Sequence, residues 1–293
     1  MTTDDPGRPD DPRKPRDDEI DVYALTHVGK VRKTNQDHFL LASMHKRIQL
    51  LQTSLSDQQR LPFGDERVGF IAMVADGVGG GDGGEKASAT TLEIATRYLV
   101  SSADCFYSAD STEEKFIQAL QDAARRCHVA VTARAKAEPA TRSMATTLTL
   151  WMGVWPWYYV LQVGDSRYYL YRDGQLTQVS RDQTIAQDLV DQGLFSRAVG
   201  LKSRFANVLS SAIGGQQAEP VVTRLRADWL NVHLLCSDGL TKHVPDERIA
   251  ERLAAMTSSK QVCEQLLEDA LDGGGTDNVT IMVGRSVPKD LPA

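Results

Sequence analysis

Acidic residues recur at the ends of apolar segments in this chain. A short apolar run precedes each of Asp76, Asp165 and Asp238. Asp277 stands just before another apolar run, and Asp37 lies at the start of a further one. An acid at the end of a buried strand suits a hard cation, because Mg²⁺ and Mn²⁺ take carboxylate and carbonyl oxygens. One such acid is typical of a solvated turn, but the recurrence favours a shared site.

A cluster of carboxylates is unfavourable without cations, because like charges repel and lose hydration when they come together. A pair of divalent ions about 3.5–4 Å apart would offset that repulsion and lower the pKa of a bridging water, giving hydroxide near neutral pH. Arg32 suits an oxyanion, because a guanidinium binds phosphate with two parallel bonds. An isolated arginine of this kind is also typical of a surface ion pair.

The elements that must position these acids follow from hydrophobic periodicity. The run Phe70–Ala75 predicts a buried strand that ends at Asp76, and a glycine-rich turn follows it. Helical spacing predicts one helix over residues 84–102 and a second from residue 111 to Pro139.

The rest of the chain alternates between groups of strands and groups of helices. Asp173-Gly174 is a strong signal for a two-residue hairpin. Further strands are predicted at residues 20–26, 146–152, 158–163, 168–171, 176–179, 208–213, 221–225, 232–236 and 279–284, and further helices at 246–256 and 259–271. This order predicts an α+β fold and not a regular alternating parallel sheet.

Composition excludes several classes of protein. A hydrophobic content of 41% supports a sizeable core, and the net charge of −6 argues against a nucleic-acid partner. We expect no membrane span and no signal peptide, because no apolar run approaches twenty residues and the N-terminus lacks the basic-then-apolar order. The cysteines (Cys105, Cys127, Cys236 and Cys263) are widely spaced, which favours buried thiols in a reducing, cytoplasmic compartment.

Four segments have their own character. Residues 1–19 are rich in Asp, Pro, Arg and Lys and predict a disordered tail before a domain at 20–286. Residues 46–66 predict a polar surface insertion, and 183–209 a helical, polar excursion. Residues 287–293 form a predicted C-terminal tail.

Six short motifs carry a family resemblance. They are Arg32–Asp37, Asp76–Gly80, Met144–Leu148, Val163–Arg167, Ser237–Gly239 and Thr276–Thr280. Their order resembles the bacterial branch of the PP2C (PPM) metal-dependent serine/threonine protein phosphatases; each motif alone is weak, and the set is highly specific. The resemblance implies a four-layer α-β-β-α sandwich with a metal centre at one end. It also implies that residues 183–209 form a mobile flap.

The resemblance further implies a set of metal ligands. Asp76 would bridge two Mn²⁺ or Mg²⁺ ions, and the Gly77 carbonyl would hold one of them. Asp238 and Asp277 would bind the other ion. Asp165, together with Asp238, would hold a third and weaker ion.

Other residues receive catalytic roles from the same resemblance. Asp37 would order metal-bound waters and act with Asp76 and Asp238 in catalysis, while Arg32 would bind the substrate phosphate. Asn207 falls where the flap would lend an oxygen to the third metal. The implied reaction is one-step hydrolysis of phosphoserine and phosphothreonine by a metal-bridging hydroxide. The implied partners are phosphoprotein substrates, including a Ser/Thr kinase or its targets, which the enzyme would counter.

Three residues depart from the family pattern. Gln36 stands where many members have a glutamate near the metal, so one negative charge is missing. Val78 replaces a histidine that serves as general acid in animal members, so the leaving group must take its proton from water or another residue. Ala145 replaces the more usual glycine before Thr146-Thr147.

Two other functions remain open from the sequence. Residues 79–84 fit a G-x-G-x-x-G dinucleotide fingerprint, but Asp76, Asp82 and Glu85 would crowd the pyrophosphate. A non-catalytic module that binds phosphoproteins is the stronger alternative, and Gln36 and Val78 are its support. The retained acids oppose it, because a decayed site is expected to lose its ligands first.

Overall fold

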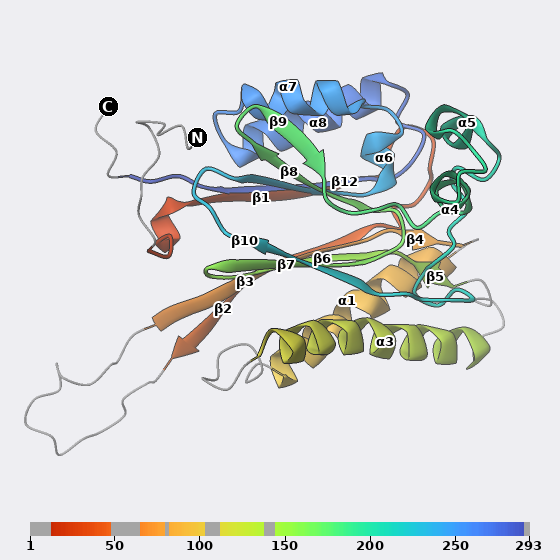
Figure 1. Cartoon of the computed structure of the whole chain (residues 1–293). Helices are drawn as coiled ribbons and strands as arrows, with labels where there is room; N and C mark the ends of the chain where they lie inside the picture. The colour runs from red at the N-terminus through yellow and green to blue at the C-terminus, as the bar shows by residue number, and fades with distance from the viewer. Residues whose placement is uncertain (1–12, 48–64, 80–81, 103–111, 138–143, 290–293) are drawn as a thin grey trace, which may run out of the picture.

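Two antiparallel sheets form the middle layers of the molecule, and helices cover their outer faces (Figure 1). The computed structural model describes residues 13–47, 65–79, 82–102, 112–137 and 144–289. The predicted α+β class and the α-β-β-α layering implied by the family resemblance are confirmed.

Each large sheet has five strands. The first follows the order β1-β12-β11-β8-β9. Its strands are β1 (Ile20–His27), β8 (Arg167–Arg172), β9 (Gln175–Gln178), β11 (Val232–Cys236) and β12 (Val279–Ser286). The second follows the order β10-β7-β6-β3-β2. Its strands are β2 (His38–Arg47), β3 (Asp65–Ala75), β6 (Leu148–Val154), β7 (Trp157–Val163) and β10 (Val221–Arg226). A third, two-stranded sheet pairs β4 (Gly77–Val78) with β5 (Ala145–Thr146).

The helices divide between the two outer faces. Helices α1 (Gly83–Ser101) and α3 (Glu113–Ala137) cover the second sheet, while α7 (Asp246–Ala254) and α8 (Ser259–Asp272) cover the first (Figure 1). The short helices are η1 (Asp17–Glu19), α4 (Ile185–Asp191), α5 (Arg197–Lys202) and α6 (Asp238–Thr241). Within the described ranges, every helix is too short or too polar to cross a bilayer.

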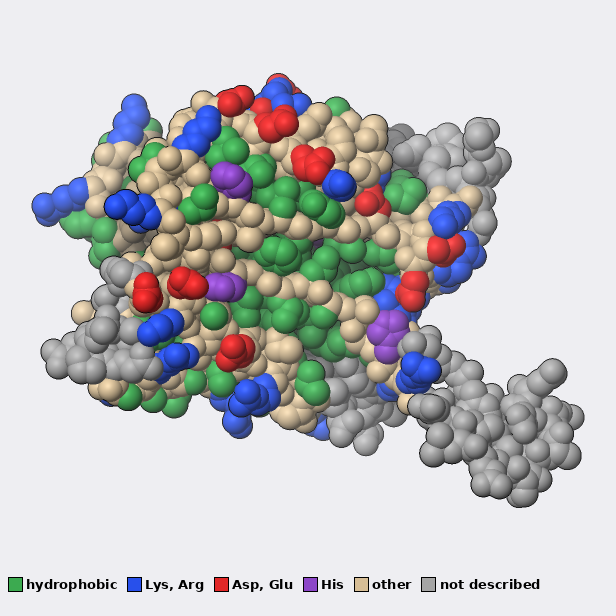
Figure 2. Space-filling model, turned by 180° about the vertical axis from the view of Figure 1, so that it is seen from behind, with side chains coloured by type: hydrophobic (Ala, Val, Ile, Leu, Met, Phe, Trp, Pro, Cys, Tyr) green, Lys and Arg blue, Asp and Glu red, His purple; other side chains and the backbone are tan. Residues whose placement is uncertain are grey.

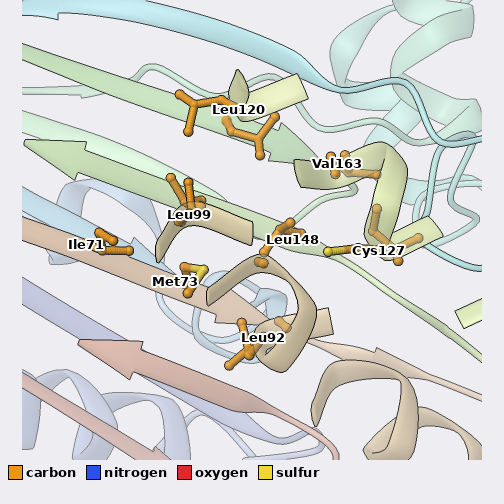
Figure 3. Packing of buried hydrophobic residues seen from close by; sticks show 14 of the residues in the cluster. Ile71, Met73, Leu92, Leu99, Leu120, Cys127, Leu148 and Val163 are labelled. Atoms are coloured by element: carbon orange, nitrogen blue, oxygen red, sulfur yellow. The ribbon is translucent and has the colours of Figure 1, made fainter. Parts of the chain in front are cut away.

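Alternation along β3 shows how one strand serves two layers. Ile71 and Met73 face α1 and α3, where they join Leu99 and Leu120 (Figure 3). Ala72 and Val74 face the other sheet. Because successive side chains of a strand point to opposite faces, a nearly continuous apolar run is what a strand between two covered layers requires. On the face drawn in Figure 2, hydrophobic side chains gather in a band across the middle of the molecule. Charged side chains lie mainly above and below this band.

One predicted strand is wrong. Residues 208–213 form no strand; they make two isolated bridges, one between Leu209 and Thr184 and one between Ile213 and Thr146. The two bridges connect this segment to different partners. Leu209 pairs with the start of the 183–209 excursion, and Ile213 pairs with β5. An apolar pattern indicates burial here, but burial alone does not supply a continuous strand partner.

The predicted N-terminal tail is too long. Residues 13–19 are described and folded, whereas residues 1–12 lie outside the described residues. Arg13 donates to both carboxylate oxygens of the buried Glu19 at 2.7 Å and stacks over the ring of Trp229 at 4.9 Å. Arg67 pairs with Asp17 at 2.7 Å. Ion pairs and stacking hold this segment, and such specific contacts cannot be read from composition.

The predicted 46–66 insertion is also too long, because β2 continues to Arg47 and β3 begins at Asp65. Residues 48–64 lie outside the described residues, as do 290–293 of the predicted C-terminal tail and Cys105. The backbone of Val287 donates to the Glu19 carbonyl at 2.8 Å, so the start of that predicted tail is attached to the domain.

Candidate metal centre

Antiparallel pairing brings the acid-bearing strand ends to one end of the sandwich. In the second sheet, His38 at the start of β2 lies opposite Ala75 at the end of β3, so Asp37 and Asp76 are neighbours. The first sheet behaves alike: Cys236 at the end of β11 lies opposite Arg167 at the start of β8. Acids distant in sequence therefore share one edge.

A cleft of about 590 Å³ opens at this end. Four of the predicted acids line it: Asp76, Asp165, Asp238 and Asp277. Arg32, Gly77 and Asn207 line it as well. The structure therefore brings together predicted site residues that lie far apart in the sequence. Asp37 is 3% exposed and lies behind the lining.

Asp37 is held rigidly by two hydroxyl groups. Ser237 Oγ and Thr280 Oγ1 each donate to its Oδ2 at 2.7 Å. Burial raises the pKa of Asp37 to about 6, although the two hydroxyl bonds oppose the rise, and the nearby Asp238 adds to it. Its Oδ1 is buried and has no hydrogen-bond partner among the described residues. A fixed carboxylate with one oxygen left over is suited to order a water molecule.

Asp76 is fixed through its backbone. Its N–H donates to Thr147 Oγ1 at 2.9 Å, and its carbonyl accepts from Thr147 N at 2.9 Å and from Thr146 Oγ1 at 2.8 Å. Burial, followed by repulsion from Asp37 and Asp238, raises the pKa of Asp76 well above its ordinary value. The side chain is therefore held where its charge is least stable without a cation.

Gly77 allows the backbone beside Asp76 to pack closely. A Cβ at Gly77 would lie 2.4 Å from the Gly84 carbonyl oxygen and 2.6 Å from that of Gln36. No side chain fits between them, since real Cβ atoms do not approach that closely. The start of α1 thereby packs against Gly77, which lines the cleft.

Asp165 lies in the turn between β7 and β8, next to the flap. Gly164 and Gln183 bind each other twice: the Gly164 N–H donates to Gln183 Oε1 at 2.8 Å, and Gln183 N donates to the Gly164 carbonyl at 3.0 Å. Arg167 donates to both carboxylate oxygens of Asp182 at 2.8 and 2.6 Å. Burial raises the pKa of Asp165 to about 8, with repulsion from Asp238 adding to the rise.

Asp238 and Asp277 are joined by a lysine. Lys242 Nζ lies 2.6 Å from Asp238 Oδ2 and 2.8 Å from Asp277 Oδ2. Arg32 Nε lies 2.8 Å from Asp277 Oδ1, and its Nη2 donates to Oδ2 at 3.0 Å. Burial alone would raise the pKa of Asp277, but its bonds with Arg32 and Lys242 lower it.

The donor set fits divalent cations by its chemistry. Asp37 Oδ1 and Asp238 Oδ1 are buried oxygens without a hydrogen-bond partner among the described residues. Several raised carboxyl pKa values in one small volume also indicate that positive charge is needed there. Within the described ranges, however, no three acidic, histidine or cysteine side chains come together as a set able to hold one ion. Two acids of the cluster are instead bonded to Lys242.

The residues that position the acids have no predicted role in the sequence pattern. Ser237, Thr280 and Thr147 anchor Asp37 and Asp76, as described above. These residues lie within or beside the motifs, so their hydroxyl groups next to each acid were the available signal. Lys242, four residues after Asp238 and directly after the short helix α6, was visible as an i, i+4 pair.

Asn278 connects the loop that carries Arg32 and Asp37 to the rest of the centre. Its Nδ2 donates to the Val28 carbonyl at 2.9 Å and the Thr34 carbonyl at 3.0 Å, and its Oδ1 accepts from Gln36 N at 2.9 Å.

Asn278→Ala is expected to destabilise the fold by about 3 kcal/mol, because it leaves three backbone groups without partners. Urea unfolding measures this loss. Asn207→Ala, on the exposed surface of the flap, is the control and should stay within about 0.5 kcal/mol of the parent protein. A loss below about 1 kcal/mol for Asn278→Ala would show that the loop does not depend on it.

The three departures from the family pattern all lie at the cleft. Gln36, Val78 and Ala145 line it, and Val78 pairs with Ala145 in the small sheet. The Gln36 carbonyl accepts from Gly77 N at 3.2 Å and from Ser88 Oγ at 2.6 Å. Ala145 is accommodated within this pairing, so its methyl group does not prevent the strand from forming.

Comparison with known proteins identifies the family. The chain belongs to the protein phosphatase 2C family, whose sequence model matches residues 52–272. The resemblance drawn from the six motifs is therefore confirmed.

Two curated relatives and one solved structure illustrate the match. The chain is 36% identical to serine/threonine protein phosphatase PstP of Mycobacterium tuberculosis over 220 residues, 75% of this chain and 41% of that protein. It is 30% identical to serine/threonine phosphatase stp of Listeria monocytogenes over 225 residues, 75% of this chain and 85% of that protein. The catalytic domain of PstP in complex with two manganese ions matches with a TM-score of 0.70 and 30% identity, over 92% of this chain and 99% of that one. The chain thus spans less than half the length of PstP.

Proposed function

We propose that this chain hydrolyses phosphoserine and phosphothreonine in phosphoproteins, with two Mn²⁺ or Mg²⁺ ions as cofactors. The observation that carries the proposal is the convergence of four acids on one cleft, with a fifth acid anchored behind them. Membership of the phosphatase 2C family and the two manganese ions of the PstP catalytic domain support it.

The cleft suggests which residues would hold the ions. Asp76 and the Gly77 carbonyl would serve one ion, with Asp76 shared between both. Asp238 and Asp277 would serve the other, and Asp165 with Asp238 would serve a third, weaker one. When bound, the ions would polarise the phosphoryl oxygens and activate a water for in-line attack. Such a reaction needs no covalent enzyme intermediate.

Arg32 would hold the substrate phosphate at the mouth of the cleft. Its side chain is 53% exposed, and Asp277 accepts from two of its nitrogens. A guanidinium carries five N–H donors, so donors remain for a phosphate. The bond to Asp277 would also orient the guanidinium before substrate arrives.

Arg32→Ala is expected to raise the KM for a phosphoserine peptide by about tenfold or more, the scale of one charge-assisted bond, with a smaller change in kcat. Arg32→Lys should recover part of the loss, because it keeps the charge and loses the fork. Steady-state kinetics at saturating Mn²⁺ measure both. A collapse of kcat at unchanged KM would contradict this role.

Asp37 would act through a water molecule and not as a ligand. Its Oδ2 is occupied by two hydroxyl donors, and its Oδ1 is the oxygen left for a water. Since Val78 offers no proton, the leaving group would take its proton from solvent or another group in the cleft.

Hydrolysis of p-nitrophenyl phosphate with and without Mn²⁺ tests the proposed activity. The proposal expects turnover that requires the metal and stops with a chelator. The alternative is a catalytically weak or inactive module that binds phosphoproteins. The departures from the family pattern at Gln36 and Val78 support this alternative. Absence of turnover at every metal concentration, together with retained binding of a phosphopeptide, would favour that alternative.

We also propose that the chain acts in the cytoplasm against a Ser/Thr kinase or its targets. The described cysteines Cys127, Cys236 and Cys263 are free and buried, which suits a reducing compartment. Phosphoproteomics after removal of the protein would identify the substrates.

A further inference from the structure

A lysine is built into the acid cluster. Lys242 Nζ bonds to Asp238 Oδ2 at 2.6 Å and to Asp277 Oδ2 at 2.8 Å. These two acids come from different elements: Asp238 opens α6, and Asp277 precedes β12. The ammonium group is the contact that joins them. Its side chain is 26% exposed, so it is largely withdrawn from solvent.

The short helix fixes where this lysine points. Lys242 follows α6 directly, and its N–H donates to the Asp238 carbonyl at 2.8 Å. One helical turn therefore separates the two residues and places their side chains on the same face. Beyond Cβ the lysine stem is flexible, so the ammonium group is able to leave the acids without a change in the backbone.

The charges around the cleft are not balanced by protein groups alone. Four acids line the cleft and Asp37 lies behind them, whereas the lining contributes two cationic side chains, Arg32 and Lys242. Arg32 bonds to one acid of the cluster, Asp277, whereas Lys242 bonds to two. Lys242 thus offsets charge at the pair of acids that the proposed function assigns to one divalent ion.

We propose that Lys242 is an internal competitor for the divalent ion at Asp238 and Asp277. This inference rests on the proposed function, since it assumes that these acids bind a metal. The ammonium group stabilises the acids when no metal is bound, and a divalent ion has to displace it. Lys242 therefore weakens metal binding at this position and raises the Mn²⁺ concentration that the enzyme needs.

Isothermal titration of the whole chain with Mn²⁺ tests this competition. Lys242→Gln keeps a long polar side chain and removes the charge. We expect the site formed by Asp238 and Asp277 to tighten by about tenfold in this variant, the scale of one charge-assisted bond. Lys242→Arg keeps the charge and should retain the affinity of the parent protein. Lys260→Gln removes an exposed lysine paired with Glu264 at 3.8 Å and is the matched control.

Thermal unfolding supplies an independent readout. In a chelator, Lys242→Gln should melt below the parent protein, because two acids lose a shared counter-ion. In saturating Mn²⁺ the two should melt together. A Lys242→Met variant repeats both measurements if the glutamine variant folds poorly.

The outcomes separate this inference from the proposed function. Unchanged or weaker Mn²⁺ binding by both neutral variants, in a parent protein that binds two ions and hydrolyses phosphopeptides, overturns the competition alone. A rise in KM without a change in Mn²⁺ affinity assigns Lys242 to the substrate and also overturns it. Absence of Mn²⁺ binding in every variant overturns both proposals.

Discussion

Asp76→Asn is expected to lower kcat by about three orders of magnitude, because loss of its charge weakens the hold on both ions and metal catalysis supplies several kcal/mol. Asp76 is the acid whose pKa is raised by all four of the other carboxyl groups, after burial itself. It is therefore the residue on which the electrostatics of the centre depend most. Mn²⁺-dependent turnover of p-nitrophenyl phosphate measures the loss, and circular dichroism checks the fold.

The same variant separates catalysis from stability. Asp76→Asn replaces a buried carboxyl group whose ionisation the fold opposes, so the variant should melt above the parent protein in a chelator. Asp122→Asn is the control, since Asp122 lies on α3 and pairs with Arg125 at 2.8 Å on the surface. The control should keep the parent activity. An Asp76→Asn enzyme with more than about a tenth of the parent turnover would contradict the role of this acid, because that corresponds to a loss of only about 1.4 kcal/mol.

The second large effect is a loss of stability with rising pH in the absence of metal. Burial raises the folded pKa of Asp165 to about 8 and that of Asp76 well above its ordinary value of 3.8. The folded chain then holds protons that the unfolded chain has released, so stability falls as the pH rises through these folded values. Between pH 6.5 and 8 the melting temperature should fall by about 5 °C.

This pH window avoids an opposing group. Burial lowers the pKa of His233 to about 3, so His233 makes the fold more stable as the pH rises from there toward 6.5. Above pH 6.5 this contribution levels off, and the acids of the centre dominate the change in stability. Mn²⁺ should raise the melting temperature more at pH 8 than at pH 6.5, and Asp76→Asn should flatten the fall in chelator. A melting temperature that stays level or rises across the window in chelator would refute the electrostatic account.

The sequence predicted the order of elements well where one physical signal dominated. The run before Asp76 is apolar throughout because β3 packs between α1 and the other sheet. The hairpin at Asp173-Gly174 is present, with φ of 49° and 78° at the two residues. Both features are local, so no knowledge of the tertiary structure was needed.

The convergence of the acids was predicted as a hypothesis, and the register that produces it was not. Pairing of His38 with Ala75 and of Cys236 with Arg167 is a long-range property, and no local pattern fixes it. The contact of Lys242 with Asp277 depends on that convergence as well. Spacing along the chain does not predict this contact with Asp277, whereas it does predict the pair of Lys242 with Asp238.

Segments held by specific partners were predicted least well. The composition of residues 13–19 favours disorder, but Arg13 and Glu19 bind each other and Arg67 binds Asp17. Residues 208–213 are mostly apolar but contact two different neighbours by single bridges. In both cases the stabilising partner comes from a distant part of the chain or from a specific ion pair, which neither composition nor periodicity measures.

The central claim is that acids far apart in the sequence hold a pair of divalent ions in one cleft. Anomalous diffraction from crystals soaked in Mn²⁺ tests it most directly. The account predicts two anomalous peaks in the cleft within bonding reach of Asp76, with Lys242 withdrawn from Asp238 and Asp277. A cleft without anomalous density, in which Lys242 still bonds to both acids at saturating Mn²⁺, would contradict it.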